Sequence, residues 1–238
     1  MIRQNHETGE RSLDLLKWGL VPSWSGDPKG APKPINAMTE TVRSKPMFRD
    51  AYRKRRCIVP VEGFFEWQAT KGGKQPYAIA MKNGAPFGLA GLWENWKDPA
   101  SGDWVRTFTI ITVPSNELIA RIHDRMPAIL RPADYKRWLG SEPDPHDLLI
   151  TFPSEPMKMW PISKRVNSPR NDDEDLLAES TSPRRRELNS LGGNEQSASR
   201  TAWLRSRHRS DVGTRSGWSQ SVCQGRIALS PRAIIEGN

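Results

Sequence analysis

The stretch VEGFFEWQ, residues 61–68, places the carboxylate of Glu66 among aromatic side chains. If this segment is a strand, alternate residues share a face, so Glu66 lies on the same face as Phe64 and opposite Phe65 and Trp67. Two interpretations follow: a carboxylate on the solvated face of an edge strand, or one held in a partly apolar cleft. In a cleft, desolvation raises the pKa above the ordinary ~4.3, which suits proton exchange near neutral pH.

Two further segments carry residues suited to acid–base or carbonyl chemistry. His123 stands in RIHDRMPAIL, residues 121–130, and is the best candidate acid or base of the chain, with a hydrogen-bonded structural histidine as the rival interpretation. Asn36 follows a proline-rich loop; it either orients a carbonyl or phosphate oxygen or is an ordinary turn residue. The other three histidines lie in polar, turn-like or tail segments (His6, His146 and His208).

Other common catalytic signatures do not occur in the sequence. No serine lies in a G-x-S-x-G frame, and there is no glycine-rich phosphate loop or metal-spaced His/Cys cluster, so we expect no metal and no cofactor. The two cysteines, Cys57 and Cys223, lie far apart in unlike contexts, which predicts neither a disulfide nor a zinc site and suits a reducing cytoplasm. Cys57 opens a strand, so an inert buried thiol is favoured over a nucleophile.

The elements that must position these residues are mostly strands, followed by short helices. Apolar and β-branched runs separated by turn signals predict the strands (15–24, 57–68 with a break near Pro60 and Gly63, 76–82, 87–96 and 106–113). Helical spacing predicts short helices (44–56, 114–124 with Ser115 as its cap, and 131–140). Strands linked by tight turns and then helices predict an α+β domain with a largely antiparallel sheet.

The chain has 238 residues and a net charge of +9 that is unevenly distributed. Residues 181–238 contain ten arginines, no lysine and four acids, without an apolar period. This composition predicts a disordered tail after a domain at 1–180, and it weakens overall basicity as an argument for a nucleic-acid partner. No apolar run reaches membrane-spanning length and no signal-peptide core is present, so we expect a soluble cytoplasmic protein.

Several segments, taken together and in chain order, resemble the SRAP family, the SOS response-associated peptidases or abasic-site processing proteins. The resemblance runs from about residue 13 to 178 and is carried by these segments: WGLVPSW, INAMTET, KPMFRDAYRKRRCIVPVEGFFEW, KQPYAIAM, GLAGLWE, FTIIT, IHDRMPAIL and WPISKRVNSPRND. It implies an α+β fold with a curved, mainly antiparallel and barrel-like β core flanked by short helices.

The resemblance also implies a function in the DNA-damage response. Members of the family bind single-stranded DNA at abasic sites and form a thiazolidine DNA–protein crosslink through a cysteine that follows the initiator methionine. Autopeptidase and lyase chemistry are linked to the same site. By motif, Glu66 corresponds to the family's acid/base glutamate, His123 to its histidine and Asn36 to its asparagine. We therefore expect single-stranded DNA with abasic sites as the partner, no membrane partner, and a monomer.

Candidate DNA contacts follow from the positively charged channel that the resemblance implies. Aromatic rings near a cleft can stack on exposed bases, each contact contributing ~1–3 kcal/mol, and arginines can bind phosphates. Core packing and ordinary surface charge are the rival interpretations. The candidates are Trp24, Phe48, Trp67, Arg43, Arg49 and Arg125.

The sequence departs from the family pattern in two respects. There is no cysteine near residue 2, so we expect an N-terminally truncated member that cannot form the crosslink and has an open strand edge or exposed apolar faces. Met38 stands where the family has an arginine that grips a phosphate. Three functions stay open: residual lyase activity through Glu66 and His123 with another amine, a degraded copy that at most binds single-stranded DNA, and, least favoured, a thiol peptidase using Cys57.

Overall fold

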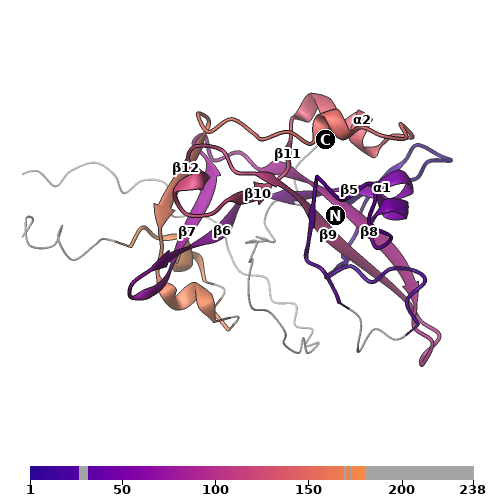
Figure 1. Ribbon diagram of the computed structural model, residues 1–238, viewed down its shortest axis with the longest axis horizontal. Coiled ribbons are helices and arrows are strands. Elements are labelled where there is room, and N and C mark those ends of the chain that lie inside the picture. The colour runs from indigo at the N-terminus through magenta and orange to yellow at the C-terminus, as the bar shows by residue number, and fades with distance from the viewer. Residues whose placement is uncertain (27–31, 169, 172, 181–238) are drawn as a thin grey trace, which may run out of the picture. The chain divides into compact units, whose positions relative to one another are not determined.

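The computed structural model describes residues 1–26, 32–168, 170–171 and 173–180 (Figure 1). The expected tail, residues 181–238, lies outside the described residues, as does Cys223. The described strands form two sheets and the helices are short, which confirms the predicted α+β class with mainly antiparallel pairing. These sheets stay open, so the barrel-like closure that the family resemblance suggested does not occur in this part of the chain. No described helix is long and apolar enough to span a membrane.

The larger sheet has nine strands built around a long antiparallel hairpin, β8 (Phe87–Lys97) and β9 (Trp104–Pro114). Its other strands are β1 (Ile2–Gln4), β2 (Arg11–Leu13), β3 (Lys17–Trp18), β4 (Asn36–Met38), β5 (Arg56–Val61), β10 (Arg125–Pro127) and β11 (Ile129–Leu130). The main order is β10-β9-β8-β5-β1-β2; β3 and β4 pair with β9 in parallel, and β11 pairs with β8. At the β2 edge, Leu13 and Leu15 are exposed.

The two strands of the long hairpin diverge near one end, and residues 125–130 fill the gap between them. β10 pairs with the end of β9, while β11 pairs with the start of β8. Ala128 joins the two: its N–H donates to the carbonyl of Ile111 at 2.8 Å, and its carbonyl accepts from the N–H of Ala90 at 2.8 Å. The backbone that carries Arg125 is therefore held in place by pairing with both strands of the hairpin.

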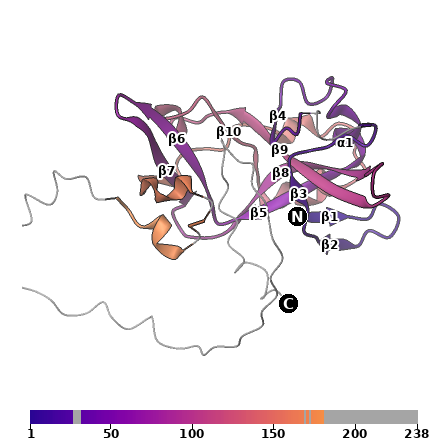
Figure 2. The same cartoon turned by 90° about the horizontal axis from the view of Figure 1, so that it is seen from below.

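The smaller sheet is antiparallel, with the order β12-β7-β6; its strands are β6 (Gly63–Thr70), β7 (Gly73–Met81) and β12 (Met157–Pro161). β6 and β7 form the hairpin that the turn-forming segment at 70–75 predicted, closed by the pair Thr70 and Gly73. Figure 2 shows β6 and β7 beside each other, with β10 of the larger sheet near β6.

The predicted break in the strand at 57–68 is the point where the chain passes from one sheet to the other. β5 belongs to the larger sheet and β6 to the smaller, with Glu62 between them. Gly63 is required here, because a Cβ at this position would lie 2.7 Å from the carbonyl oxygen of Ile79. Beyond the break, alternation places Phe64 in the main core and Phe65 in a smaller apolar cluster on the opposite face.

The helices are shorter than the sequence indicates. The two α-helices are α1 (Arg49–Lys54) and α2 (Tyr135–Leu139), and the 3-10 helices are η1 (Ile119–Arg121), η2 (Pro132–Asp134), η3 (His146–Leu148), η4 (Lys164–Asn167) and η5 (Glu174–Leu177). The helix predicted at 114–124 is wrong: only η1 forms, since β9 extends to Pro114 and β10 begins at Arg125. Ser115 is not its cap; the side-chain oxygen of Asn116 accepts the N–H of Ile119 at 3.1 Å.

A buried arginine joins the two α-helices. The Arg56 side chain is only 4 % exposed, and its guanidinium donates to backbone carbonyls at the C-terminal ends of both helices. The accepting residues are Tyr52 (2.8 Å), Arg53 (3.4 Å), Trp138 (2.6 Å), Gly140 (2.7 Å) and Glu142 (2.7 Å). Carbonyls at helix ends have no partner within the helix, and a positive charge there is favourable, so Arg56 caps both helices at once.

Candidate functional site

A pocket between the two sheets brings the three predicted catalytic residues together. Its volume is about 230 Å³, and we call it the inter-sheet pocket. Side chains from β3, β4, β6, β9, β10 and the segment before β10 line it. The polar lining residues are Asn36, Glu66, Thr112, His123 and Arg125, and the apolar ones include Trp18, Met38 and Met126. Segments distant in sequence therefore converge on one hollow.

Glu66 lies on β6 and is partly buried in the inter-sheet pocket. Burial raises the pKa of Glu66 above its ordinary value, and the negative charge of Asp124 acts in the same direction. The charge of His123 and a backbone hydrogen bond at Trp67 oppose this shift without cancelling it. Of the two interpretations, a solvated strand face or a partly apolar cleft, Glu66 therefore occupies the cleft. Its carboxyl group can exchange protons at higher pH than that of a solvated glutamate.

His123 stands between η1 and β10 with its side chain 41 % exposed. Its Nδ1 atom lies 3.0 Å from both the backbone nitrogen and the carbonyl oxygen of Arg125, and 3.4 Å from a carboxylate oxygen of Asp124. The local backbone thus fixes the orientation of the ring. Nε2 has no protein partner among the described residues, which leaves it available to a ligand in the pocket.

Asn36 is in a strand rather than in the turn that its local sequence favoured. β4 pairs in parallel with β9, with Asn36 opposite Ile110. Alternation buries Ala37 and exposes Asn36 and Met38, both of which line the inter-sheet pocket. The amide of Asn36 can therefore reach a polar group of a bound ligand, beside the apolar side chain of Met38.

Arg125 supplies the positive charge of the inter-sheet pocket. Its guanidinium makes an ion pair with Glu40, with an Nη1–Oε1 distance of 2.5 Å, and donates to the carbonyl oxygen of Thr112 at 2.6 Å. Glu40 follows β4 directly and was not among the predicted site residues. No local pattern signals this contact, because it joins residues 85 positions apart in the chain.

The described chain matches known proteins over most of its length. Residues 1–169 match the model of the family described as SOS response associated peptidase (SRAP). The chain belongs to the SRAP family. Abasic site processing protein YoqW of Bacillus subtilis (strain 168) is 41 % identical over 170 residues, which cover 69 % of this chain and 75 % of YoqW. Abasic site processing protein HMCES of Xenopus tropicalis is 32 % identical over 201 residues, covering 74 % and 60 %.

A solved structure is similar as well. A crystal structure of a Bacteroides thetaiotaomicron protein has a TM-score of 0.66 at 33 % sequence identity, covering 70 % of this chain and 76 % of that one. Together with the family match, this similarity confirms the predicted SRAP-like fold.

None of the three aromatic candidates lines the inter-sheet pocket of this SRAP domain. Phe48 belongs to the main core and is 4 % exposed, so its proposed stacking on a base is wrong for this conformation. Trp67 packs against the smaller apolar cluster, and its indole N–H donates to the side-chain oxygen of Asn167 at 2.8 Å. Trp24 is 64 % exposed and can meet a base, but it does not line the pocket.

Of the three arginine candidates, only Arg125 lines the inter-sheet pocket. Arg43 pairs with Asp144 at 3.1 Å, and Arg49 lies 3.7 Å from Asp50. Both are half exposed, so as DNA contacts they remain predictions for a surface outside the pocket. The site that the SRAP fold assembles is therefore smaller than the predicted set of residues.

Cys57 is a core residue and not a nucleophile of the SRAP domain. Its side chain is fully buried in the main core, and burial raises the pKa of the thiol to about 12. Because the thiolate is the reactive form, a peptidase that uses Cys57 is ruled out in this conformation. We expect iodoacetamide to leave Cys57 unmodified in the native protein and to label it in denaturant, as read by peptide mass mapping; rapid native labelling would contradict the burial.

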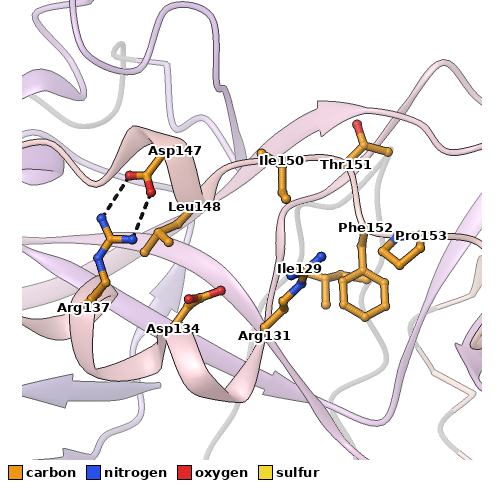
Figure 3. Close-up of a pocket in the computed structure, with 10 residues that line it drawn as sticks. All are labelled: Ile129, Arg131, Asp134, Arg137, Asp147, Leu148, Ile150, Thr151, Phe152 and Pro153. Atoms are coloured by element: carbon orange, nitrogen blue, oxygen red, sulfur yellow. Dashed lines mark hydrogen bonds and ion pairs between the residues drawn. The ribbon is translucent and has the colours of Figure 1, made fainter.

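A second hollow lies beside α2, outside the predicted site (Figure 3). Its floor is apolar, with Ile129 and Leu148, while Arg137 on its wall is paired with Asp147 at 2.9 Å and with Glu142 at 2.8 Å. The second hollow contains none of the predicted catalytic residues, and its Arg137 charge is paired within the fold. The described residues also include no group of three or more His, Cys, Asp or Glu that could hold a metal ion.

Proposed function

We propose that this chain processes abasic sites in single-stranded DNA as part of the DNA-damage response. The relatives support an abasic site as the substrate, since several of them are abasic site processing proteins. The observation that carries the proposal is the convergence of Asn36, Glu66, His123 and Arg125 on one pocket. This set combines a base with a raised pKa, an imidazole, an amide and a cation, which together suit an aldehydic sugar next to a phosphate.

The proposed chemistry assigns a step to each polar residue. An abasic sugar opens when its C1′–O4′ bond breaks; His123 gives a proton to O4′ and the C1′ hydroxyl gives its proton to water, which leaves an aldehyde. The amide of Asn36 donates to the aldehyde oxygen. Glu66 then removes a proton from C2′, the electrons form a C2′–C3′ double bond, and the C3′–O bond breaks with the phosphate as leaving group. Positioned acids and bases accelerate such proton transfers.

We propose further that neither Cys57 nor Cys223 forms the thiazolidine crosslink. The reaction needs an accessible thiol beside an amine on the same residue, and Cys57 is sealed in the core. The described residues that line the inter-sheet pocket include no primary amine either, so Glu66 acts as a direct base in this proposal. A Schiff-base route with an amine from elsewhere is the rival, and it leaves an adduct that borohydride reduces.

The test uses a single-stranded oligonucleotide with one abasic site, its duplex and an undamaged strand. We expect cleavage of the abasic single strand, with an unsaturated aldehyde on the 3′ end, and no heat-stable covalent band on a denaturing gel. Preferential binding without cleavage would support the degraded copy instead. A covalent band lost only on mutating Cys57 or Cys223 would overturn the statement on crosslinking. Equal binding of all three DNAs would overturn the proposed specificity for an abasic site.

A further inference from the structure

The guanidinium of Arg125 is held from two sides at the inter-sheet pocket. Its Nη1 and Nη2 atoms lie 2.5 and 3.0 Å from the two carboxylate oxygens of Glu40, a bidentate arrangement. On the other side, Nη2 donates to the carbonyl oxygen of Thr112 at 2.6 Å. The Arg125 side chain is 18 % exposed and that of Glu40 is 45 % exposed. The cation is therefore anchored and the anion is open to solvent.

A carboxylate bound in this way occupies the place that a phosphate takes on an arginine, because both ligands present two oxygens to the same fork of N–H groups. We propose that Glu40 is a resident anion at a phosphate site on Arg125, and that a DNA phosphate displaces it on binding. This inference rests on the proposed function, since it assumes single-stranded DNA in the inter-sheet pocket. It adds a specific competitor that weakens DNA binding.

The exchange is feasible because Arg125 does not depend on Glu40 for its position. Its backbone belongs to β10, opposite Pro114 of β9, and the bond from Nη2 to Thr112 remains when the carboxylate leaves. Glu40, by contrast, lies in a turn after β4 and contacts the guanidinium from the solvent side. A phosphate that replaces it meets an arginine already in place.

The location of the exchange ties it to the proposed chemistry. The backbone of Arg125 also contacts Nδ1 of His123, at 3.0 Å. A phosphate captured by the guanidinium is thus held next to the imidazole, and the neighbouring sugar enters the pocket that contains Glu66. Glu40 therefore sets how strongly the phosphate that precedes or follows the lesion is gripped.

The test compares DNA binding by the wild type and Glu40→Gln as a function of salt. A single strand with a tetrahydrofuran abasic analogue is titrated by fluorescence anisotropy between about 50 and 200 mM salt. Removing the resident charge is expected to tighten binding several-fold, because the phosphate no longer has to displace an anion. The slope of log Kobs against log salt is expected to steepen by at most about 0.7, the value for one phosphate on a single strand, because the displaced carboxylate of the wild type still offsets part of the Arg125 charge. Glu40→Ala, as the second variant, is expected to act in the same direction.

The matched control is Glu155→Gln, which makes the same change of charge at an exposed turn residue away from the inter-sheet pocket. We expect it to leave the slope unaltered. In the double variant Glu40→Gln/Arg125→Gln, the gain is expected to disappear. Unchanged or weaker binding by a folded Glu40→Gln protein would show that Glu40 only clamps Arg125 and would overturn the inference. Absence of DNA binding by the wild type would instead overturn the proposed function.

Discussion

Glu66→Gln is expected to lower the rate of abasic-strand cleavage by about 10²–10⁴-fold, the usual contribution of a positioned general base. Glutamine has nearly the same shape and keeps the packing of β6, but it cannot accept the C2′ proton. The affinity for a tetrahydrofuran-containing strand is expected to change little, because no phosphate contact is lost. Single-turnover cleavage assays and anisotropy titrations measure the two quantities separately.

The pH dependence gives the same prediction a second readout. A base must be deprotonated, so the rate rises with pH through the pKa of Glu66, which burial places above that of an ordinary glutamate. This rising limb is expected to vanish in Glu66→Gln. The matched control is Glu62→Gln at the exposed strand break, which is expected to cleave at the wild-type rate. Equal rates for Glu66→Gln and Glu62→Gln would remove Glu66 from the mechanism.

The same shift has a consequence for stability whose sign is fixed. The folded state binds the Glu66 proton more tightly than the unfolded state does, so its contribution is favourable at low pH and is lost as pH rises through the raised pKa. Glutamine does not ionise, so the Glu66→Gln protein does not lose this stability as the pH rises. The Glu66→Gln protein is therefore expected to melt no lower than the wild type at pH 8, which separates a loss of chemistry from a loss of folding.

Arg56→Met is expected to destabilise the protein by at least about 3 kcal/mol, because each buried carbonyl left without a partner costs about 1–3 kcal/mol. Methionine replaces much of the side-chain stem but donates to none of the carbonyls that Arg56 bonds, including those of Tyr52, Trp138 and Gly140. For a domain of this size the melting temperature falls by about 6–12 °C. Thermal unfolding followed by circular dichroism measures the change.

Arg53→Met is the control for this prediction. Arg53 lies on the exposed side of α1, and only its backbone carbonyl takes part in the Arg56 network. Exposed substitutions away from such networks usually stay within about 0.5 kcal/mol, so this variant is expected to melt close to the wild type. Equal melting temperatures for Arg56→Met and Arg53→Met would show that the capping of both α-helices by Arg56 contributes nothing measurable to stability.

The sequence was most informative where patterns are local. The strands around 57–68, 76–82, 87–96 and 106–113 appear in the structure, because β-branched and aromatic runs between turn signals have few alternatives. The helix at 114–124 failed because β9 and β10 must pair as an antiparallel hairpin, which leaves room for only one 3-10 turn. Tertiary pairing overrode a helical pattern that was locally sound.

The site shows the same division between local and tertiary information. Alternation placed Glu66 on one face of its strand, but the sequence alone could not say whether that face meets water or a second sheet. Phe48 and Trp67 have the residue type of base-stacking groups, yet they pack in apolar clusters. The role of Glu40 depends on a contact with Arg125 across 85 residues, which no spacing rule predicts.

Hydrogen–deuterium exchange with a bound tetrahydrofuran-containing single strand tests the central claim most directly, since it locates the lesion on the protein. If the lesion binds in the inter-sheet pocket, three segments are protected together: β4, the start of β6 and residues 123–127. Full protection is expected only with the abasic analogue, and an undamaged strand is expected to protect them less. Protection confined to other surfaces, or none at these three segments despite measured binding, would contradict the account.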